Sequence, residues 1–193
     1  MKTILEIFIK NSNLYAEELL YSDGINEFTW TSFYKEVVKV ANLLKKNGVG
    51  EGDKVACCCE SNFEYYLTLI GCWYIGAIFV PMNKTLAKKH QRYIIEKVSP
   101  KVIVYSDCEN ILKEECQTTL LIQDRKDSFI DASILVVSDE NDIAMIMFTS
   151  GTTGVPKGAI NTHKALLANV WLTGGNLNLS EKDRILINTP AYY

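Results

Sequence analysis

The sequence predicts an α/β domain in which a largely parallel sheet is flanked by helices. Short apolar runs typical of buried strands alternate with longer segments whose apolar residues recur every three to four positions, as on one face of a helix. Glycines, prolines and helix-capping residues separate the two kinds of segment. Because a helix lies between most successive strands, we expect parallel pairing through right-handed crossovers.

The first half of the chain supplies the clearest elements. Residues 1–10 are typical of an amphipathic helix, since Glu6 interrupts their apolar stretch. The next helix begins at Thr31 or Ser32 and ends at Gly48. Further helices are predicted over residues 63–74 and 85–99, the latter ending there because the residue before proline resists helical geometry. Strands are predicted over residues 54–59, 77–81 and 101–105.

The second half continues the alternation. Strands are predicted over residues 120–122, 143–148 and 184–188, with a short helix over residues 110–116. Thr162 can cap a helix that runs to the pair Gly174 and Gly175. The length of 193 residues allows one domain, or one domain with an appended lobe.

Residues 147–158 are the most informative part of the chain. They read Met-Phe-Thr-Ser-Gly-Thr-Thr-Gly-Val-Pro-Lys-Gly. Glycines let a backbone approach a ligand closely, hydroxyls and amides donate hydrogen bonds, and Lys157 supplies positive charge. The segment follows the predicted strand 143–148, and open α/β sheets bind ligands where their strands end. The sequence therefore predicts a phosphate-binding loop; a flexible connector between two elements is the alternative.

Two other phosphate motifs are excluded by spacing. A Walker loop needs Gly-Lys-Ser/Thr, but here Pro156 precedes Lys157 and Gly158 follows it. The dinucleotide fingerprint Gly-x-Gly-x-x-Gly is also missing, since the glycines at positions 48, 50 and 52 alternate after a predicted helix.

The segment 147–158 resembles the phosphate-binding signature of the adenylate-forming (AMP-dependent) synthetases and ligases. This family includes acyl-CoA synthetases, aryl-CoA ligases, luciferases and the adenylation domains of peptide synthetases. Residues 28–55, 75–83 and 188–193 are similar to further blocks of the family, in family order. The resemblance identifies residues 1–193 as the N-terminal portion of such a domain, its N-terminal subdomain, with the family's C-terminal domain absent.

The resemblance implies an activity and a set of ligands. Family members use ATP to activate a carboxylate as an acyl-adenylate, release pyrophosphate, and pass the acyl group to a thiol of CoA or of carrier-protein phosphopantetheine. It assigns no catalytic residue to this chain, and it implies that the Mg²⁺ ligand lies in a later block of the family. The residues that it implies in contact with the ATP phosphates are Thr149, Ser150, Gly151, Thr152, Thr153, Gly154 and Lys157.

Two further positions border the substrate pocket by the same resemblance. His163 stands where the family often has a histidine opening the helix after the loop; a local hydrogen bond at the helix start is an equal alternative. Tyr193 stands where many acyl-CoA synthetases carry histidine and other branches carry an aromatic residue, and core packing explains a tyrosine there equally well.

Two hypotheses of function remain open. In the first, the chain is part of an AMP-forming ligase; alone, it binds ATP weakly and forms no acyl-adenylate. In the second, it is a non-catalytic nucleotide-binding or partner-binding module that has kept the fold. Either way, we expect apolar surface near residue 188 to promote self-association.

Composition excludes several other classes. A net charge of −3 gives no reason to expect nucleic acid or an anionic membrane as a partner. Residues 65–83 carry no charge, but Gly71, Gly76 and Pro81 argue against a membrane span. Three of the six cysteines are consecutive in a predicted strand, so their side chains alternate faces and cannot meet at one metal ion. We expect no metal site, free buried thiols and a cytoplasmic location.

Overall fold

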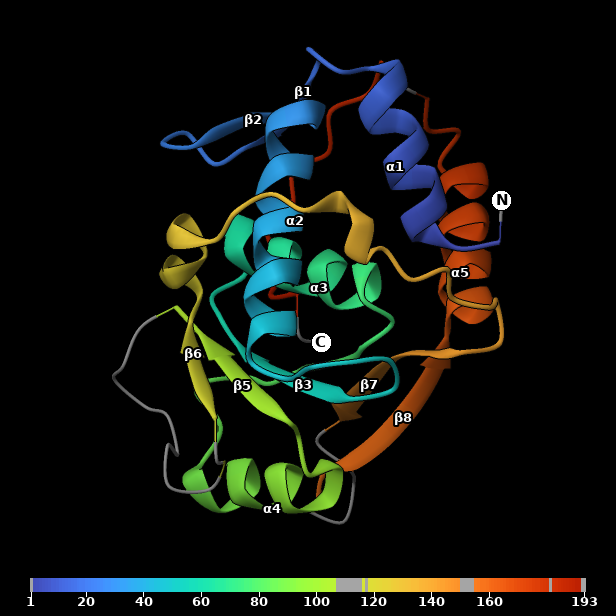
Figure 1. Cartoon of the computed structure of the whole chain (residues 1–193). Helices are drawn as coiled ribbons and strands as arrows, with labels where there is room; N and C mark the ends of the chain where they lie inside the picture. Colours follow the sequence, from blue (N-terminus) through green and yellow to red (C-terminus); the bar gives the residue numbers. More distant parts are fainter. Residues whose placement is uncertain (1, 107–115, 117, 150–154, 181, 192–193) are drawn as a thin grey trace.

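The computed structural model describes residues 2–106, 116, 118–149, 155–180 and 182–191 (Figure 1). Within these ranges, a six-stranded sheet has the order β6-β5-β3-β4-β7-β8. Its strands are β3 (Lys54–Cys58), β4 (Ile78–Pro81), β5 (Val102–Tyr105), β6 (Thr119–Leu121), β7 (Ile143–Thr149) and β8 (Lys157–Thr162). Every neighbouring pair is parallel except β7 and β8, which are antiparallel. The largely parallel sheet predicted from the sequence is confirmed.

Helices cover both faces of this sheet (Figure 1). They are α1 (Ile4–Leu14), α2 (Trp30–Lys46), α3 (Phe63–Tyr74), α4 (Lys88–Val98) and α5 (His163–Asn176). In Figure 1, α2 and α3 lie above the sheet and α4 lies below it. A separate antiparallel pair, β1 (Leu19–Ser22) and β2 (Glu27–Thr29), precedes α2. The expected α/β class is therefore confirmed.

Strand β3 shows how the two faces are filled. Val55 and Cys57 belong to the hydrophobic cluster formed with α1, α2 and α3, whereas Ala56 and Cys58 belong to the cluster formed with α4. All four are buried, as expected for a strand with a covered sheet face on either side. Cys59 returns to the first cluster. The consecutive cysteines thus alternate between faces, as the sequence predicted.

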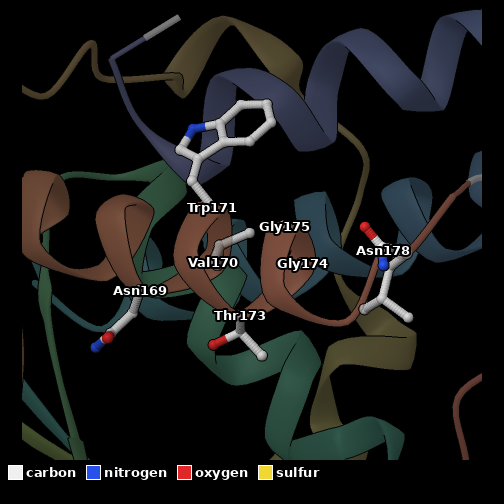
Figure 2. A pocket seen from close by; sticks show the side chains of 8 residues that line it. Asn169, Val170, Trp171, Thr173, Gly174, Gly175 and Asn178 are labelled. Atoms are coloured by element: carbon white, nitrogen blue, oxygen red, sulfur yellow. The ribbon is translucent and has the colours of Figure 1, made fainter.

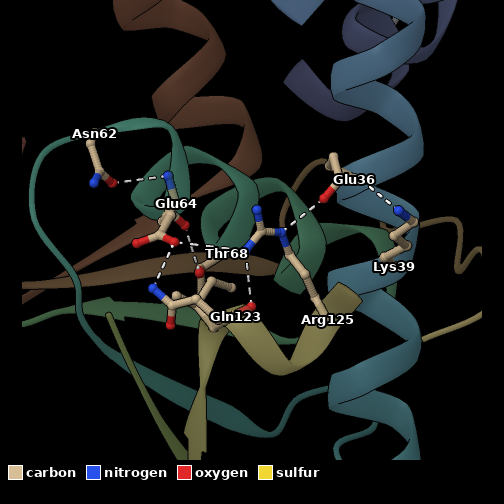
Figure 3. Close-up of polar contacts among 8 residues, drawn as sticks. Glu36, Lys39, Asn62, Glu64, Thr68, Gln123 and Arg125 are labelled. Atoms are coloured by element: carbon tan, nitrogen blue, oxygen red, sulfur yellow. Dashed lines mark hydrogen bonds and ion pairs between the residues drawn. The ribbon is translucent and has the colours of Figure 1, made fainter. Parts of the chain in front are cut away.

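A buried polar cluster joins α2 and α3 to the short helix η2 (Ile122–Asp127), as Figure 3 shows. The Arg125 Nε donates to Glu36 Oε2 at 2.9 Å, and Arg125 Nη1 lies 3.7 Å from Glu64 Oε1. Gln123 Nε2 donates to the same Glu64 oxygen at 3.0 Å. Burial alone would raise the pKa of Glu36, but hydrogen bonds from Lys39 and Arg125 outweigh it and lower that pKa. Burial raises the pKa of Glu64, partly opposed by the charge of Arg125.

Three sequence-based element predictions need correction or stay open, and one strand had no prediction. Residues 184–188 form no strand; Ile185, Leu186 and Ile187 are 67%, 89% and 60% exposed, and no described strand pairs with them. The antiparallel strand β8 was not predicted. The cap of α2 is the Thr29 hydroxyl, which accepts the Ser32 N–H, instead of Thr31 or Ser32. The predicted helix over residues 110–116 lies outside the described residues, apart from its last position.

The α4 boundary also differs from the prediction. The Asn83 side chain accepts the backbone N–H of Thr85 at 2.8 Å, so a turn occupies this position and the helix begins at Lys88.

No helix in the described part of the chain has the length and apolar character needed to cross a membrane. The cysteines at positions 57, 58, 59 and 72 are buried and form no disulfide among the described residues, and burial raises the pKa of Cys72 well above its usual value.

Candidate functional site

The predicted phosphate loop joins the two strands of the β7–β8 hairpin. Strand β7 runs parallel to β4, so Thr149 lies at the carboxyl end of the parallel part of the sheet. The last rung of the hairpin pairs Thr149 with Lys157, and both residues are exposed. The rung brings these two predicted site residues together at the two ends of the loop. The other predicted phosphate contacts, at positions 150–154, lie outside the described residues.

Lys157 differs from the other lysine at this sheet edge. Lys84, which follows β4, forms an ion pair with Glu60, which follows β3. Lys157 is exposed and forms no ion pair with any residue that the structure describes. Its charge is therefore available to an anionic ligand at the edge where parallel sheets bind ligands.

The opposite end of the hairpin is fixed to the helix layer. Trp73 on α3 donates a hydrogen bond from Nε1 to the Ala144 carbonyl oxygen at 2.9 Å, and both residues are buried. The Trp73 ring also meets His163 edge to face, with ring centroids 5.6 Å apart. The backbone N–H of His163 donates to the backbone carbonyl oxygen of Asp142 at 3.1 Å. These contacts hold the first residues of β7 and of α5 against α3.

His163 therefore lies at the far end of the hairpin from Lys157. Thr162, its neighbour, pairs with Ile143 at the first rung, and the six residues of β8 place Thr162 about 17 Å from Lys157. His163 is only 3% exposed, and burial lowers its pKa, with the Asp142 charge opposing in part. Its Nδ1 has no hydrogen-bond partner among the described residues. The structure does not bring it together with the phosphate-loop residues.

The segment leading to Tyr193 returns to the carboxyl edge of the sheet. The Tyr65 hydroxyl donates to the Ala191 carbonyl oxygen at 2.7 Å, and the Ala191 N–H donates to Ser61 Oγ at 2.8 Å. Ser61 lies just beyond β3. Tyr193 itself is outside the described residues. Sequence reasoning missed Ser61 and Tyr65, because side chains that bond a distant main chain leave no local pattern.

Two pockets lined by described residues lack the chemistry of the candidate site. An open pocket of about 890 Å³ lies along the outer side of α5. Figure 2 shows Trp171 pointing to one side of α5 and Asn169 and Thr173 to the other, so these side chains do not converge on a common point. Another pocket, of about 410 Å³, is lined by apolar and aromatic residues of α1, α2 and α3 together with Ile187. No charged side chain lines it, so it offers no cation to a phosphate group.

Comparison with known sequences gives a consistent assignment. The family model described as AMP-binding enzyme matches residues 10–193. The chain is 28% identical over 173 residues to N-benzoylphenylalaninol synthetase apmA of Penicillium brevicompactum, covering 89% of the chain and 7% of that protein. It is 27% identical over 179 residues to feruloyl-CoA synthase of an Amycolatopsis species, covering 88% of the chain and 35% of that protein. The chain thus spans well under half the length of these relatives.

Solved structures share the fold. The o-succinylbenzoate CoA synthetase (MenE) of Bacillus subtilis, in complex with the acyl-adenylate intermediate OSB-AMP, superposes with a TM-score of 0.87 at 21% identity, covering 98% of this chain and 50% of that one. The N-terminal domain of FACL13 from Mycobacterium tuberculosis gives a TM-score of 0.86 at 22% identity, and the match covers 100% of this chain and 52% of that one. Both matches extend over almost the whole chain. The chain therefore belongs to the AMP-binding enzymes, the adenylate-forming family that includes acyl-CoA ligases and peptide-synthetase adenylation domains.

Proposed function

We propose that this chain supplies the phosphate-binding part of an enzyme that activates a carboxylate with ATP. A carboxylate oxygen attacks the α-phosphorus, the bond from that phosphorus to the bridging oxygen of pyrophosphate breaks, and an acyl-adenylate forms. A thiol of CoA or of a carrier-protein phosphopantetheine then displaces AMP. The observation that carries this proposal is the Thr149–Lys157 rung, which holds the ends of a glycine- and hydroxyl-rich loop at the carboxyl edge of the sheet.

The proposed role of the loop is electrostatic. Negative charge builds on the β- and γ-phosphates as pyrophosphate leaves, and positioned donors with one cation stabilise it. Thr149 and Lys157 provide a hydroxyl and an ammonium group from opposite strands. Positions 150–154 contribute the remaining donors in this proposal.

Mg²⁺ chemistry is not assigned to the residues described here. Among them, no group of three or more His, Cys, Asp or Glu side chains could hold a metal ion. The proposal assigns no protein ligand of Mg²⁺ and no group that recognises adenine, ribose or the carboxylate, so the substrate and the thiol acceptor stay unassigned.

Carboxylate-dependent exchange of labelled pyrophosphate into ATP tests this function. We expect exchange by the protein encoded by the complete gene, with a panel of aliphatic, aromatic and amino acids as substrates. We expect none from residues 1–193 alone, although we expect this chain to bind ATP weakly. Exchange by the isolated 193-residue chain would contradict the expectation that this chain alone forms no acyl-adenylate. Absence of ATP binding in both proteins would contradict the proposed function.

A further inference from the structure

Gly158 lies beneath an aromatic ring at the base of the loop. Phe148 and Gly158 face each other in the hairpin, one rung before Thr149 and Lys157. A Cβ atom on Gly158 would lie 3.1 Å from Phe148 Cζ, 3.2 Å from Phe148 Cε1 and 3.4 Å from Ile146 Cγ2. The ring of Phe148 therefore occupies the space that any other side chain at position 158 would need.

Backbone conformation does not explain this glycine. Among the described glycines, those with positive φ are at positions 24, 48, 52 and 76, and Gly158 is not one of them. Glycine inside a strand marks a close approach by another group. Here the approaching group is the Phe148 ring, so the contact itself accounts for the residue.

The ring is also fixed from its other side. Ile146 and Phe148 point to the face of the sheet that α4 covers, and both pack against the cluster that contains Val80, Ile94 and Tyr105. Phe148 thus connects the core on this face to the backbone of β8. The ring therefore lies between this core and the β8 backbone at Gly158, next to the rung that carries Lys157.

We propose that Phe148 is a positioning residue for the nucleotide phosphates. Its ring, packed against Gly158, sets the local twist of the β7–β8 hairpin at the base of the loop, and thereby the relative orientation of Thr149 and Lys157. This inference rests on the proposed function of the loop. It adds a specific contact outside the hydroxyl, amide and lysine groups that meet the ligand.

The test compares two glycine substitutions. Gly158→Ala forces the ring or the strand to move by a few tenths of an ångström, whereas Gly174→Ala, on α5, meets no atom within 4 Å and serves as the matched control. NMR titrations of the 193-residue chain with ATP and with inorganic tripolyphosphate give the dissociation constants, and circular dichroism gives Tm. We expect Gly158→Ala to raise both dissociation constants about tenfold, because small displacements are costly in a preorganised site. Gly174→Ala should leave them unchanged.

A double variant separates positioning from general damage. Phe148→Leu alone should also weaken binding, because the shorter side chain no longer covers Gly158. Combined with Gly158→Ala, the new methyl group fills the space that the ring has left, so we expect the double variant to bind more tightly than either single variant. Losses that simply add in the double variant, or unchanged affinity in Gly158→Ala, would overturn the inference. If Gly158→Ala does not fold, unchanged affinity in a folded Phe148→Leu chain overturns it.

The proposed function and this inference fail in different ways. Lys157→Ala removes a group proposed to contact phosphate. If Lys157→Ala weakens ATP binding while Gly158→Ala does not, the loop binds phosphate but Phe148 does not position it. If neither substitution changes the binding, the proposed function of the loop is wrong as well.

Discussion

The indole of Trp73 on α3 and the carbonyl group of Ala144 on β7 form a buried hydrogen bond of 2.9 Å. This bond fixes the start of β7 to the helix layer, while Thr149 at the end of the same strand is exposed at the sheet edge. The hairpin thus has a buried end, which the Trp73 bond attaches to the helix layer, and an exposed end, which carries the candidate site. The two ends can be tested separately.

Replacing Trp73 tests the buried end. Trp73→Phe leaves the Ala144 carbonyl without its donor, and we expect it to lower the free energy of unfolding by about 1–3 kcal/mol, the cost of an unsatisfied buried acceptor. Urea denaturation measures the change. Trp171, which is 66% exposed, provides the matched control, and Trp171→Phe should change stability by less than about 0.5 kcal/mol. Equal effects of the two substitutions would contradict the importance of the bond.

The buried polar cluster around Arg125 makes a second prediction. Arg125→Met leaves Glu64 without its cationic partner and Glu36 with Lys39 alone, and we expect a loss of about 3 kcal/mol because removal of one member of a buried pair leaves uncompensated charge. Lys39→Met, which breaks the more exposed ion pair with Glu36, should cost less than about 1 kcal/mol. Chemical denaturation of both variants measures the two changes in the free energy of unfolding. A cost for Arg125→Met no larger than that for Lys39→Met would show that the cluster is not structurally important.

The buried His163 predicts a pH dependence of stability. Burial lowers its pKa in the folded state below the usual value of 6.5, against the opposing charge of Asp142, so the unfolded chain takes up a proton more readily. Its contribution to stability is complete above pH 6.5 and is lost as the pH falls toward the folded-state pKa. His163→Phe should flatten the stability profile in this window, as measured by urea denaturation between pH 7.5 and 5. His90→Gln is the control, and an undiminished slope in His163→Phe would assign the effect to other groups.

Removing the loop lysine tests the exposed end. Lys157→Ala should weaken ATP binding by roughly tenfold or more, the effect of losing one charge-assisted hydrogen bond to a phosphate oxygen. Because Lys157 is exposed, the free energy of unfolding should hardly change. Lys164→Ala removes an exposed lysine at the other end of the hairpin, paired with Glu140, and should leave ATP binding intact. Equal losses in both variants would indicate a general charge effect instead of a site.

Exposed apolar residues on and after α5 predict self-association. Trp171, Leu172, Ile185 and Leu186 are each at least 64% exposed, and apolar surface of this kind favours contact between molecules. Sedimentation velocity should show concentration-dependent association of the 193-residue chain. Leu172→Glu should reduce it, whereas Val137→Glu, at an 82% exposed position elsewhere, should not. A dilute and a concentrated sample that are both purely monomeric would contradict this expectation.

Periodicity was sufficient to predict the elements that pack against the sheet. The helix around Val37 and the strand around Ala56 carry apolar residues that are fully buried, so their pattern reports the core directly. Tertiary context decided the failures. The apolar run 184–188 has the composition of a strand, yet a strand needs a partner, and the described chain offers none. Strand β8 has exposed residues and little alternation, so its sequence carries no strand signal.

The candidate site could be predicted from the sequence only where its chemical groups lie close together along the chain. Hydroxyls, glycines and Lys157 within one short segment indicate phosphate binding without any knowledge of the fold. The contacts that fix the start of β7 and the segment before Tyr193 join residues far apart in the chain: Trp73 with Ala144, and Tyr65 with Ala191. A hydrogen bond to a main-chain carbonyl places no demand on the identity of the residue that accepts it. Such contacts therefore leave no trace that a single sequence can reveal.

The most direct test of the central claim is a crystal structure of the complete protein with ATP. Our account predicts that the β- and γ-phosphates lie against the loop between Thr149 and Lys157, with the Lys157 ammonium group within hydrogen-bond distance of a phosphate oxygen. A well-ordered triphosphate bound elsewhere on the protein, with Lys157 facing solvent, would contradict it.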